Sequence, residues 1–199
     1  MAKAFSSDEK LEIRQKMMDT ALEIFHESGT KGLSIKELTT RVGIAQGSFY
    51  NFWKDKDALL LDVMQYRSAQ KLAVIEKHFN KSLDNPVKFL SDIIYEYSID
   101  LKEKCEAKPI YAEALSMLVK KNEGRAYEID DLYIGFIKKL ANYWKEKGAV
   151  KEVDEVGLIN AFPGSFVLFS NYYKFEKEYF NDILKTFIVS AVEKYIGYR

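Results

Sequence analysis

Residues 46–56 carry the side chains in this chain that are best suited to bind a nucleic acid. Gln46 can form a bidentate contact with adenine, and Ser48 can donate a hydrogen bond to a base or a phosphate. Gly47 permits close approach of the backbone, and Tyr50 carries a hydroxyl group on a stiff ring that can donate to a phosphate. Each residue alone also suits an ordinary surface position. The prediction therefore depends on their order along one short segment.

Other kinds of chemistry have little support in the sequence. Carboxylates are abundant, but none forms a recognisable acid/base pair, and no serine-nucleophile motif or phosphate-binding loop is present. His26 and His78 are too isolated to suggest a metal site, and Cys105 stands alone, without a second cysteine for an internal disulfide. We therefore expect no catalytic residues, no metal and no cofactor. An enzyme is the weakest of the function classes considered.

Two short predicted helices position the candidate nucleic-acid contacts. Ser34 caps the first, with Glu37 three residues further on, and Gly43 ends it. After a tight turn, the second helix is predicted for residues 46–52. Two short helices joined by a turn that contains glycine are typical of a helix-turn-helix, in which the second helix presents its first residues to base edges in the major groove.

The opposite side of the second short helix is predicted to be buried. Phe49, Phe52 and Trp53 are spaced three and four residues apart, so they should pack on Leu22, Phe25, Leu38 and Val42. Local charge agrees with a surface that meets phosphates, because residues 28–56 carry a net charge of +3. The whole chain has 30 basic and 30 acidic residues, so the remainder carries −3.

Composition and hydrophobic patterning indicate an all-α protein. The 199 residues are 47% hydrophobic and include only 10 Gly and 3 Pro, which makes a sheet-rich fold a poor first guess. We expect a three-helix head at residues 1–55, joined to a larger helical body at residues 56–199. Caps and apolar spacing predict about nine helices in all, over residues 6–29, 34–43, 46–52, 56–79, 86–104, 109–120, 125–147, 153–175 and 178–196.

The sequence contains no targeting or membrane segment that we can recognise. The first 19 residues lack the apolar stretch of a secretory signal. The longest apolar runs, residues 58–61 and 166–169, are far too short to cross a bilayer. We expect a cytoplasmic protein with no membrane partner.

Residues 42–59 read Val-Gly-Ile-Ala-Gln-Gly-Ser-Phe-Tyr-Asn-Phe-Trp-Lys-Asp-Lys-Asp-Ala-Leu. This order of glycine, recognition helix, tyrosine, aromatic pair and two lysines resembles the tetracycline-repressor (TetR) family of bacterial transcription regulators. The similarity runs from Lys16 to Leu60, about a quarter of the chain at the level of the motif. The resemblance implies an all-helical fold with a helix-turn-helix DNA-binding head and a ligand-binding and dimerisation body.

The resemblance also assigns roles to individual residues of the head. The positions that read bases or nearby backbone are Lys36, Gln46 and Ser48, with Gly47 where the main chain comes close to the duplex. Tyr50 and Lys56 occupy the positions of phosphate contacts, and Ser34 and Lys16 are weaker candidates.

Two residues of the head depart from the family pattern. Ala45 replaces a Ser or Thr that often caps the recognition helix, which removes about 1 kcal/mol of capping unless another group replaces it. Trp53 stands where Phe is usual, which we interpret as a change of core volume that leaves the contacts unaltered.

The body carries weaker signals. Its last two predicted helices are apolar over more than one face, which suggests burial against a second copy, and the resemblance implies a homodimer through these two helices. A two-fold dimer would set the recognition helices about 34 Å apart, one turn of the duplex. The resemblance also implies a ligand cavity in the body. Its candidate lining residues are the aromatic residues Tyr95, Tyr111, Phe136, Trp144 and Phe169.

These expectations describe a ligand-responsive regulator, most simply a repressor. It would bind a palindromic operator in double-stranded DNA as a homodimer and be released by a small lipophilic effector with one or two polar atoms. An alternative stays open. A nearly neutral head without Ser or Thr at position 45 also suits a helical small-molecule-binding or interaction protein that no longer reads DNA.

Overall fold

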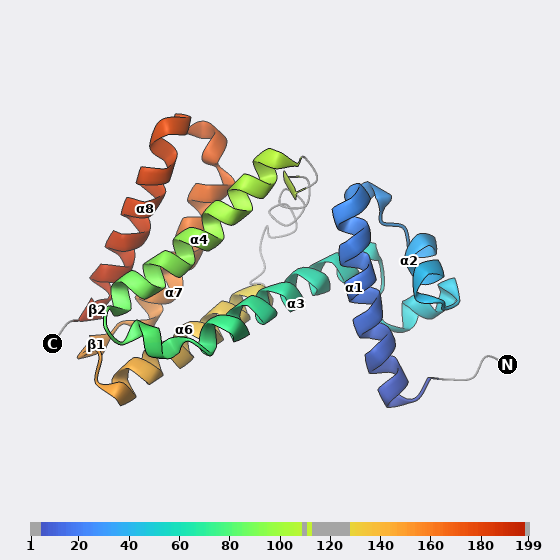
Figure 1. The fold of residues 1–199 in the computed structure, drawn as a ribbon, viewed down its shortest axis with the longest axis horizontal. Coiled ribbons are helices and arrows are strands. Elements are labelled where there is room, and N and C mark those ends of the chain that lie inside the picture. Colours follow the sequence, from blue (N-terminus) through green and yellow to red (C-terminus); the bar gives the residue numbers. More distant parts are fainter. Residues whose placement is uncertain (1–4, 109–110, 113–127, 198–199) are drawn as a thin grey trace.

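Two helical units share the long helix α3. The computed structural model describes residues 5–108, 111–112 and 128–197, and over these residues the predicted all-α fold is confirmed. Figure 1 shows the small amino-terminal head at one end of α3 and a larger helical body around its other end. The head is built from α1 (Ser7–Gly32), α2 (Ile35–Val42), η1 (Gln46–Asn51) and the first half of α3 (Lys56–Glu76).

Local capping signals determine where the head helices begin and end. Ser6 Oγ accepts a hydrogen bond from the Glu9 N–H at 3.2 Å, and the Ser6 N–H donates to the Glu9 carboxylate at 2.7 Å, which forms the expected capping box. Gly29, with φ of +79°, interrupts α1 where we predicted its end, but helical structure resumes and continues to Gly32. Gly43 adopts the left-handed conformation (φ +82°) that ends α2.

The second helix of the pair differs from the prediction. Residues 46–51 form a 3₁₀-helix, η1, in which the Ser48 N–H bonds to the Ala45 carbonyl at 2.9 Å and the Phe52 N–H bonds to the Phe49 carbonyl at 3.0 Å. Ala45 provides no side-chain cap, and Gly47 is a poor helix former. A short segment with so little intrinsic helical preference adopts the tighter i→i+3 geometry.

The body packs four longer helices around the second half of α3. They are joined by 3₁₀ turns and one short antiparallel strand pair, which we did not predict. Beyond α3, the elements are η2 (Phe79–Ser82), α4 (Pro86–Ala107), α6 (Glu128–Lys147), β1 (Glu152–Val153), α7 (Glu155–Ser170), η3 (Tyr172–Lys174), α8 (Lys177–Lys194) and β2 (Ile196–Gly197). The helix predicted over residues 109–120 lies almost wholly outside the described residues. None of the described helices is long and apolar enough to cross a membrane.

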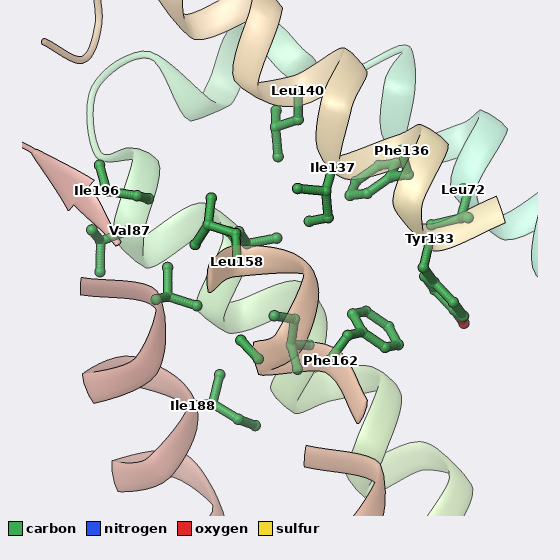
Figure 2. Packing of buried hydrophobic residues seen from close by; sticks show 14 of the residues in the cluster. Leu72, Val87, Tyr133, Phe136, Ile137, Leu140, Leu158, Phe162, Ile188 and Ile196 are labelled. Carbon is green, nitrogen blue, oxygen red and sulfur yellow. The ribbon is translucent and has the colours of Figure 1, made fainter. Parts of the chain in front are cut away.

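Each unit has its own hydrophobic core, and α3 contributes to both. In the head, Leu59 and Leu60 of α3 pack with buried residues of α1, α2 and η1. In the body, Leu72 of α3 belongs to a second core, which Figure 2 shows from close by. There, Ile137 and Leu140 of α6 lie near Leu158 of α7, among the larger set Val87, Tyr133, Phe136, Phe162, Ile188 and Ile196. The predicted boundary between head and body at residue 55 stays a prediction, because α3, which begins at Lys56, contributes residues to both cores.

Candidate DNA-binding surface

Five polar or glycine residues of α2 and η1 lie on the outer side of the head. Four of them are exposed, and Ser48 is half-buried. We name this set the reading surface; it consists of Lys36, Gln46, Gly47, Ser48 and Tyr50. A Cβ atom built on Gly47 would meet no atom within 4 Å, so the backbone at this position faces open space. Their exposure agrees with the predicted accessibility of these residues, and their contact with DNA stays a prediction.

Aromatic residues hold the reading surface from behind. Phe49 is fully buried, Trp53 is 6% exposed, and their ring centroids lie 5.7 Å apart. Phe52 is half-buried against the same core, which confirms the predicted inner face of the segment. Tyr50 remains 58% exposed while the edge of its ring meets Phe49 at 5.4 Å. The phenol is thus supported by the core and still open to a large partner.

The two weaker candidates for phosphate contacts serve the head itself. Ser34 Oγ accepts from the Glu37 N–H at 3.1 Å and so caps the start of α2. Lys16 Nζ donates to the Val42 carbonyl at 3.1 Å, so the ammonium group neutralises the negative end of the α2 dipole. Both residues position α2, and a contact from either of them to DNA stays a prediction.

Fewer positively charged groups of the head are available to a partner than the residue count suggests. Arg41 donates to Glu27 at 2.9 Å and to Glu37 at 2.8 Å. These bonds raise the pKa of Arg41 above its ordinary value, and the bond to Arg41 lowers the pKa of Glu27. Arg41 is therefore occupied by two carboxylates. Lys36 and Lys54, by contrast, form no ion pair with any residue in the described part of the chain.

Lys56, the other predicted phosphate contact, begins α3. Asp55 Oδ1 accepts from the Ala58 N–H at 2.7 Å and caps this helix, as the sequence predicts. Lys56 is half-buried in the first turn, on the side of the head where η1 ends. Its main chain is thus held by the cap, close in sequence to the reading surface.

The five residues predicted for a ligand cavity all belong to the body core or pack against it, and their contact with a ligand stays a prediction. Phe136, Trp144 and Phe169 are buried, and the Trp144 indole N–H donates to Ser82 Oγ at 2.6 Å. Tyr95 is half-buried on α4, with Lys185 Nζ 5.7 Å from its ring centroid. Tyr111 packs against the body core and also contacts the head.

A different group of residues encloses hydroxyl groups inside the body. Tyr133 of α6 is buried and stacks on Phe162 of α7, with centroids 3.8 Å apart, and the Tyr97 ring lies 5.9 Å away. Burial raises the pKa of Tyr133 well above its ordinary value, and its hydrogen bond with Tyr97 raises it further, while a bond with Ser68 lowers it. We name Ser68, Tyr97 and Tyr133 the hydroxyl cluster. Three helices contribute to it, so no local spacing in the sequence could have revealed it.

The second contact missed by the sequence joins the head to the body. The Tyr111 hydroxyl and His26 Nδ1 form a hydrogen bond of 2.6 Å, although 85 positions separate the two residues. The Tyr111 ring also meets the Phe25 ring edge-on at 5.3 Å. Burial lowers the pKa of His26, and the nearby positive charges of Arg67, Lys108 and Lys104 lower it further.

Comparisons with known proteins agree with this architecture. Residues 17–63 match the model of the family described as bacterial regulatory proteins, tetR family. The transcriptional repressor QsdR of R. erythropolis, itself from the TetR family, has a similar fold: the TM-score is 0.68 at 12% identity, over 98% of each chain. The head of the chain thus resembles the DNA-binding head of the TetR family. RolR in complex with resorcinol is also similar, with a TM-score of 0.65 at 16% identity, over 94% of this chain and 95% of that chain.

Curated transcriptional regulators of the helix-turn-helix type match part of the chain. The regulator AcrR of Shigella flexneri is 27% identical over 90 residues, which cover 45% of this chain and 41% of that protein. The uncharacterised regulator YerO of Bacillus subtilis is 32% identical over 69 residues, which cover 33% of this chain and 24% of that protein. These matches span less than half of either relative. AcrR and YerO are described as transcriptional regulators, and QsdR as a transcriptional repressor.

Proposed function

We propose that this protein is a homodimeric transcriptional repressor that binds a palindromic operator in double-stranded DNA and is released by a small lipophilic effector. It would act in the cytoplasm. The observation that carries the proposal is the reading surface. Its polar residues are accessible on α2 and η1, while the buried Phe49 and Trp53 anchor the segment in the core of the head.

The reading surface offers both kinds of contact that a DNA reader needs. The Gln46 amide suits adenine, and Ser48 suits either a base or a phosphate. Tyr50, Lys36 and Lys56 provide a hydroxyl group and two ammonium groups for the duplex backbone, which supplies affinity and register. Because Gly47 faces open space, a phosphate or sugar could approach the main chain closely.

Exposed apolar stripes on the last two helices support a homodimer. On α7, Val156 and Val167 are 69% and 61% exposed and lie eleven residues apart, on the face that turns away from the buried Phe162. On α8, Tyr179 and Ile183 form a similar exposed pair. A second copy would cover both stripes in a four-helix contact. A stable interface of this kind buries roughly 2,000 Å² or more.

The hydroxyl cluster supports an effector that carries a polar atom on an otherwise aromatic or aliphatic molecule. Tyr133 and Phe162 lie between α6 and α7, near Phe136 and Leu72 (Figure 2). Two structures of similar fold were solved with ligands of this general chemistry: RolR with resorcinol, and FadR of Bacillus subtilis with stearoyl-CoA (TM-score 0.53, 14% identity). Phe136, one of the predicted ligand residues, lies one helical turn from Tyr133 on α6.

The Tyr111–His26 bond supports communication between effector and DNA. It joins the segment after α4 to α1, so a shift of the body would reach the head both through this contact and through α3. An effector that binds better to one head arrangement would shift the population towards it. Coupling of about 1–3 kcal/mol is typical of such linkage.

Binding to the DNA upstream of its own gene tests the proposed function. A double variant, Gln46→Ala with Tyr50→Phe, removes one base contact and one phosphate contact, and we expect at least a tenfold loss of affinity by fluorescence anisotropy. The matched control, Asn142→Ala with Tyr173→Phe, removes the same functional groups from exposed positions of the body and should bind normally. Undiminished binding by the first variant would overturn the proposal. Absence of DNA binding at any salt concentration, together with tight small-molecule binding, would support the alternative function.

A further inference from the structure

A polar cluster ties the end of the recognition segment to both long helices of the head. Asp62 Oδ2, on α3, accepts a hydrogen bond from the Trp53 indole N–H at 2.8 Å and another from Arg14, on α1, at 2.5 Å. The Arg14 guanidinium carbon also lies 5.8 Å from the centroid of the Trp53 ring. We name Arg14, Trp53 and Asp62 the Asp62 junction. One carboxylate oxygen thus contacts both α1 and Trp53, the second residue after η1.

The recognition segment has little of its own to define its direction. η1 contains six residues and has no side-chain hydrogen bond at its start. Burial of Phe49 fixes how deeply the segment sits in the head, but apolar packing is not directional. The hydrogen bond that the Trp53 indole N–H donates is directional, because N–H···O contacts weaken steeply away from linearity. The Asp62 junction therefore restrains the rotation of η1 more sharply than the core does.

Burial makes the Trp53 contact the stronger half of the junction. Trp53 is 6% exposed, whereas the side chains of Asp62 and Arg14 are 21% and 43% exposed. A buried N–H that loses its acceptor has no water to replace it, whereas the Arg14 guanidinium group can return to solvent.

We propose that Asp62 is a positioning residue for DNA reading, which acts through Trp53 and Arg14 to set the angle of η1 against α3. The inference rests on the proposed function and adds a residue that touches no base. Because α3 continues into the body core at Leu72, the same junction passes a movement of α3 on to the reading surface. The loss of this restraint should therefore impair base reading more than phosphate attraction.

The test compares two variants on two DNA duplexes. Trp53→Phe keeps the ring but removes the N–H, and Asp62→Ala removes the shared acceptor. The control is Glu76→Ala, which removes another α3 carboxylate that is paired with Lys139 at 2.9 Å in the body. Affinity is measured by anisotropy for the upstream DNA and for an unrelated duplex of equal length, at several salt concentrations. The thermal midpoint of each variant is recorded as well.

We expect each variant of the junction to bind the upstream DNA about tenfold more weakly and the unrelated duplex within about twofold of wild type. The salt dependence should not change, because no phosphate contact is removed. The double variant, Trp53→Phe with Asp62→Ala, should bind the upstream DNA no more weakly than the worse single variant, since both substitutions remove the same Trp53–Asp62 contact. Glu76→Ala should match wild type on both duplexes.

Several results would overturn the inference. If Trp53→Phe reads the upstream DNA as wild type does, or loses only thermal stability, the junction is merely structural. An equal loss on both duplexes with a shallower salt dependence would indicate a lost phosphate contact instead. Trp53→Phe decides the question even if Asp62→Ala fails to fold. If the wild-type protein itself prefers neither duplex, the proposed function fails together with the inference. In the other outcomes the wild-type protein still prefers the upstream DNA, so the two kinds of failure are distinguishable.

Discussion

The head and the body both bury aromatic residues, but they place their polar groups in opposite ways. In the head, Phe49 and Trp53 form part of the core while Gln46 and Tyr50 are exposed beside them. In the body, hydroxyl groups such as that of Tyr133 are enclosed by the core. An outward display suits a large, rigid partner such as a duplex, and an enclosed polar group suits a small one. The comparison therefore separates two kinds of recognition within one chain.

The two regions also differ in how their functional groups are assembled. Four of the five residues of the reading surface fall within five consecutive positions of the sequence. The hydroxyl cluster takes one residue each from α3, α4 and α6, and the Tyr111–His26 bond spans 85 positions. A substitution in the head should therefore change binding with little effect on folding. A substitution in the body should change folding first.

The largest expected effect is in the body core. Trp144→Ala removes a fully buried ring and its hydrogen bond to Ser82, so the free energy of unfolding should fall by about 3–5 kcal/mol. Gln46→Ala, at an exposed position, should change it by less than about 0.5 kcal/mol. Urea denaturation monitored by circular dichroism measures both values. Equal losses of unfolding free energy in the two variants would contradict this difference between head and body.

The next effect is at the exposed face of the last two helices. Ile183→Asp places a charge in the proposed dimer contact, where it would be buried without a partner, so we expect a monomer with a folded core. Loss of the second head should weaken operator binding by roughly 100-fold. Sedimentation and anisotropy measure the two quantities. Asn142→Asp, at an exposed position on α6, is the control. A dimer that persists in Ile183→Asp would exclude this face as the contact.

A smaller effect is expected at the junction between the two units. Tyr111→Phe removes the hydroxyl group that bonds to His26 but keeps the ring against Phe25. We expect a loss of about 0.5–1.5 kcal/mol in the free energy of unfolding, which is the usual net value of such a bond. Tyr143→Phe, at another half-buried tyrosine of the body, provides a comparison. If the unfolding of Tyr111→Phe matches wild type, the bond does not hold the two units together.

Local signals made the head largely predictable. Ser34 caps α2 as predicted, Ser6 and Asp55 cap the helices predicted to begin beside them, and Gly43 ends α2 in the left-handed conformation. The 3₁₀ form of η1 was not predicted, because the spacing of apolar residues does not distinguish two tight turns from an α-helix. Trp53 was interpreted only as a change of volume, whereas its N–H group bonds to Asp62, nine positions further on.

Most of what the sequence missed depends on contacts between distant segments. The pairing of β1 with β2 joins positions 152–153 to 196–197, and each strand is too short to leave a pattern. Lys16 reaches Val42, so a residue predicted as a weaker phosphate contact also caps the end of α2. Helix boundaries in the body were close to the prediction. The sequence did not predict which side chains of the body pack together, because tertiary packing alone determines which aromatic residues meet.

The smallest expected effect is a dependence of stability on pH at the Tyr111–His26 bond. Burial and the positive charges of Arg67, Lys108 and Lys104 lower the pKa of His26 in the folded protein below its ordinary value of 6.5. Below that pH the unfolded chain binds a proton that the folded one resists, so this contribution to stability is present above pH 6.5 and is lost as pH falls towards the lowered pKa. His26→Gln should flatten this part of the stability profile, measured by urea denaturation in steps of pH. If His26→Gln keeps the wild-type slope, His26 does not titrate at the junction, and the contact between head and body does not respond to protons.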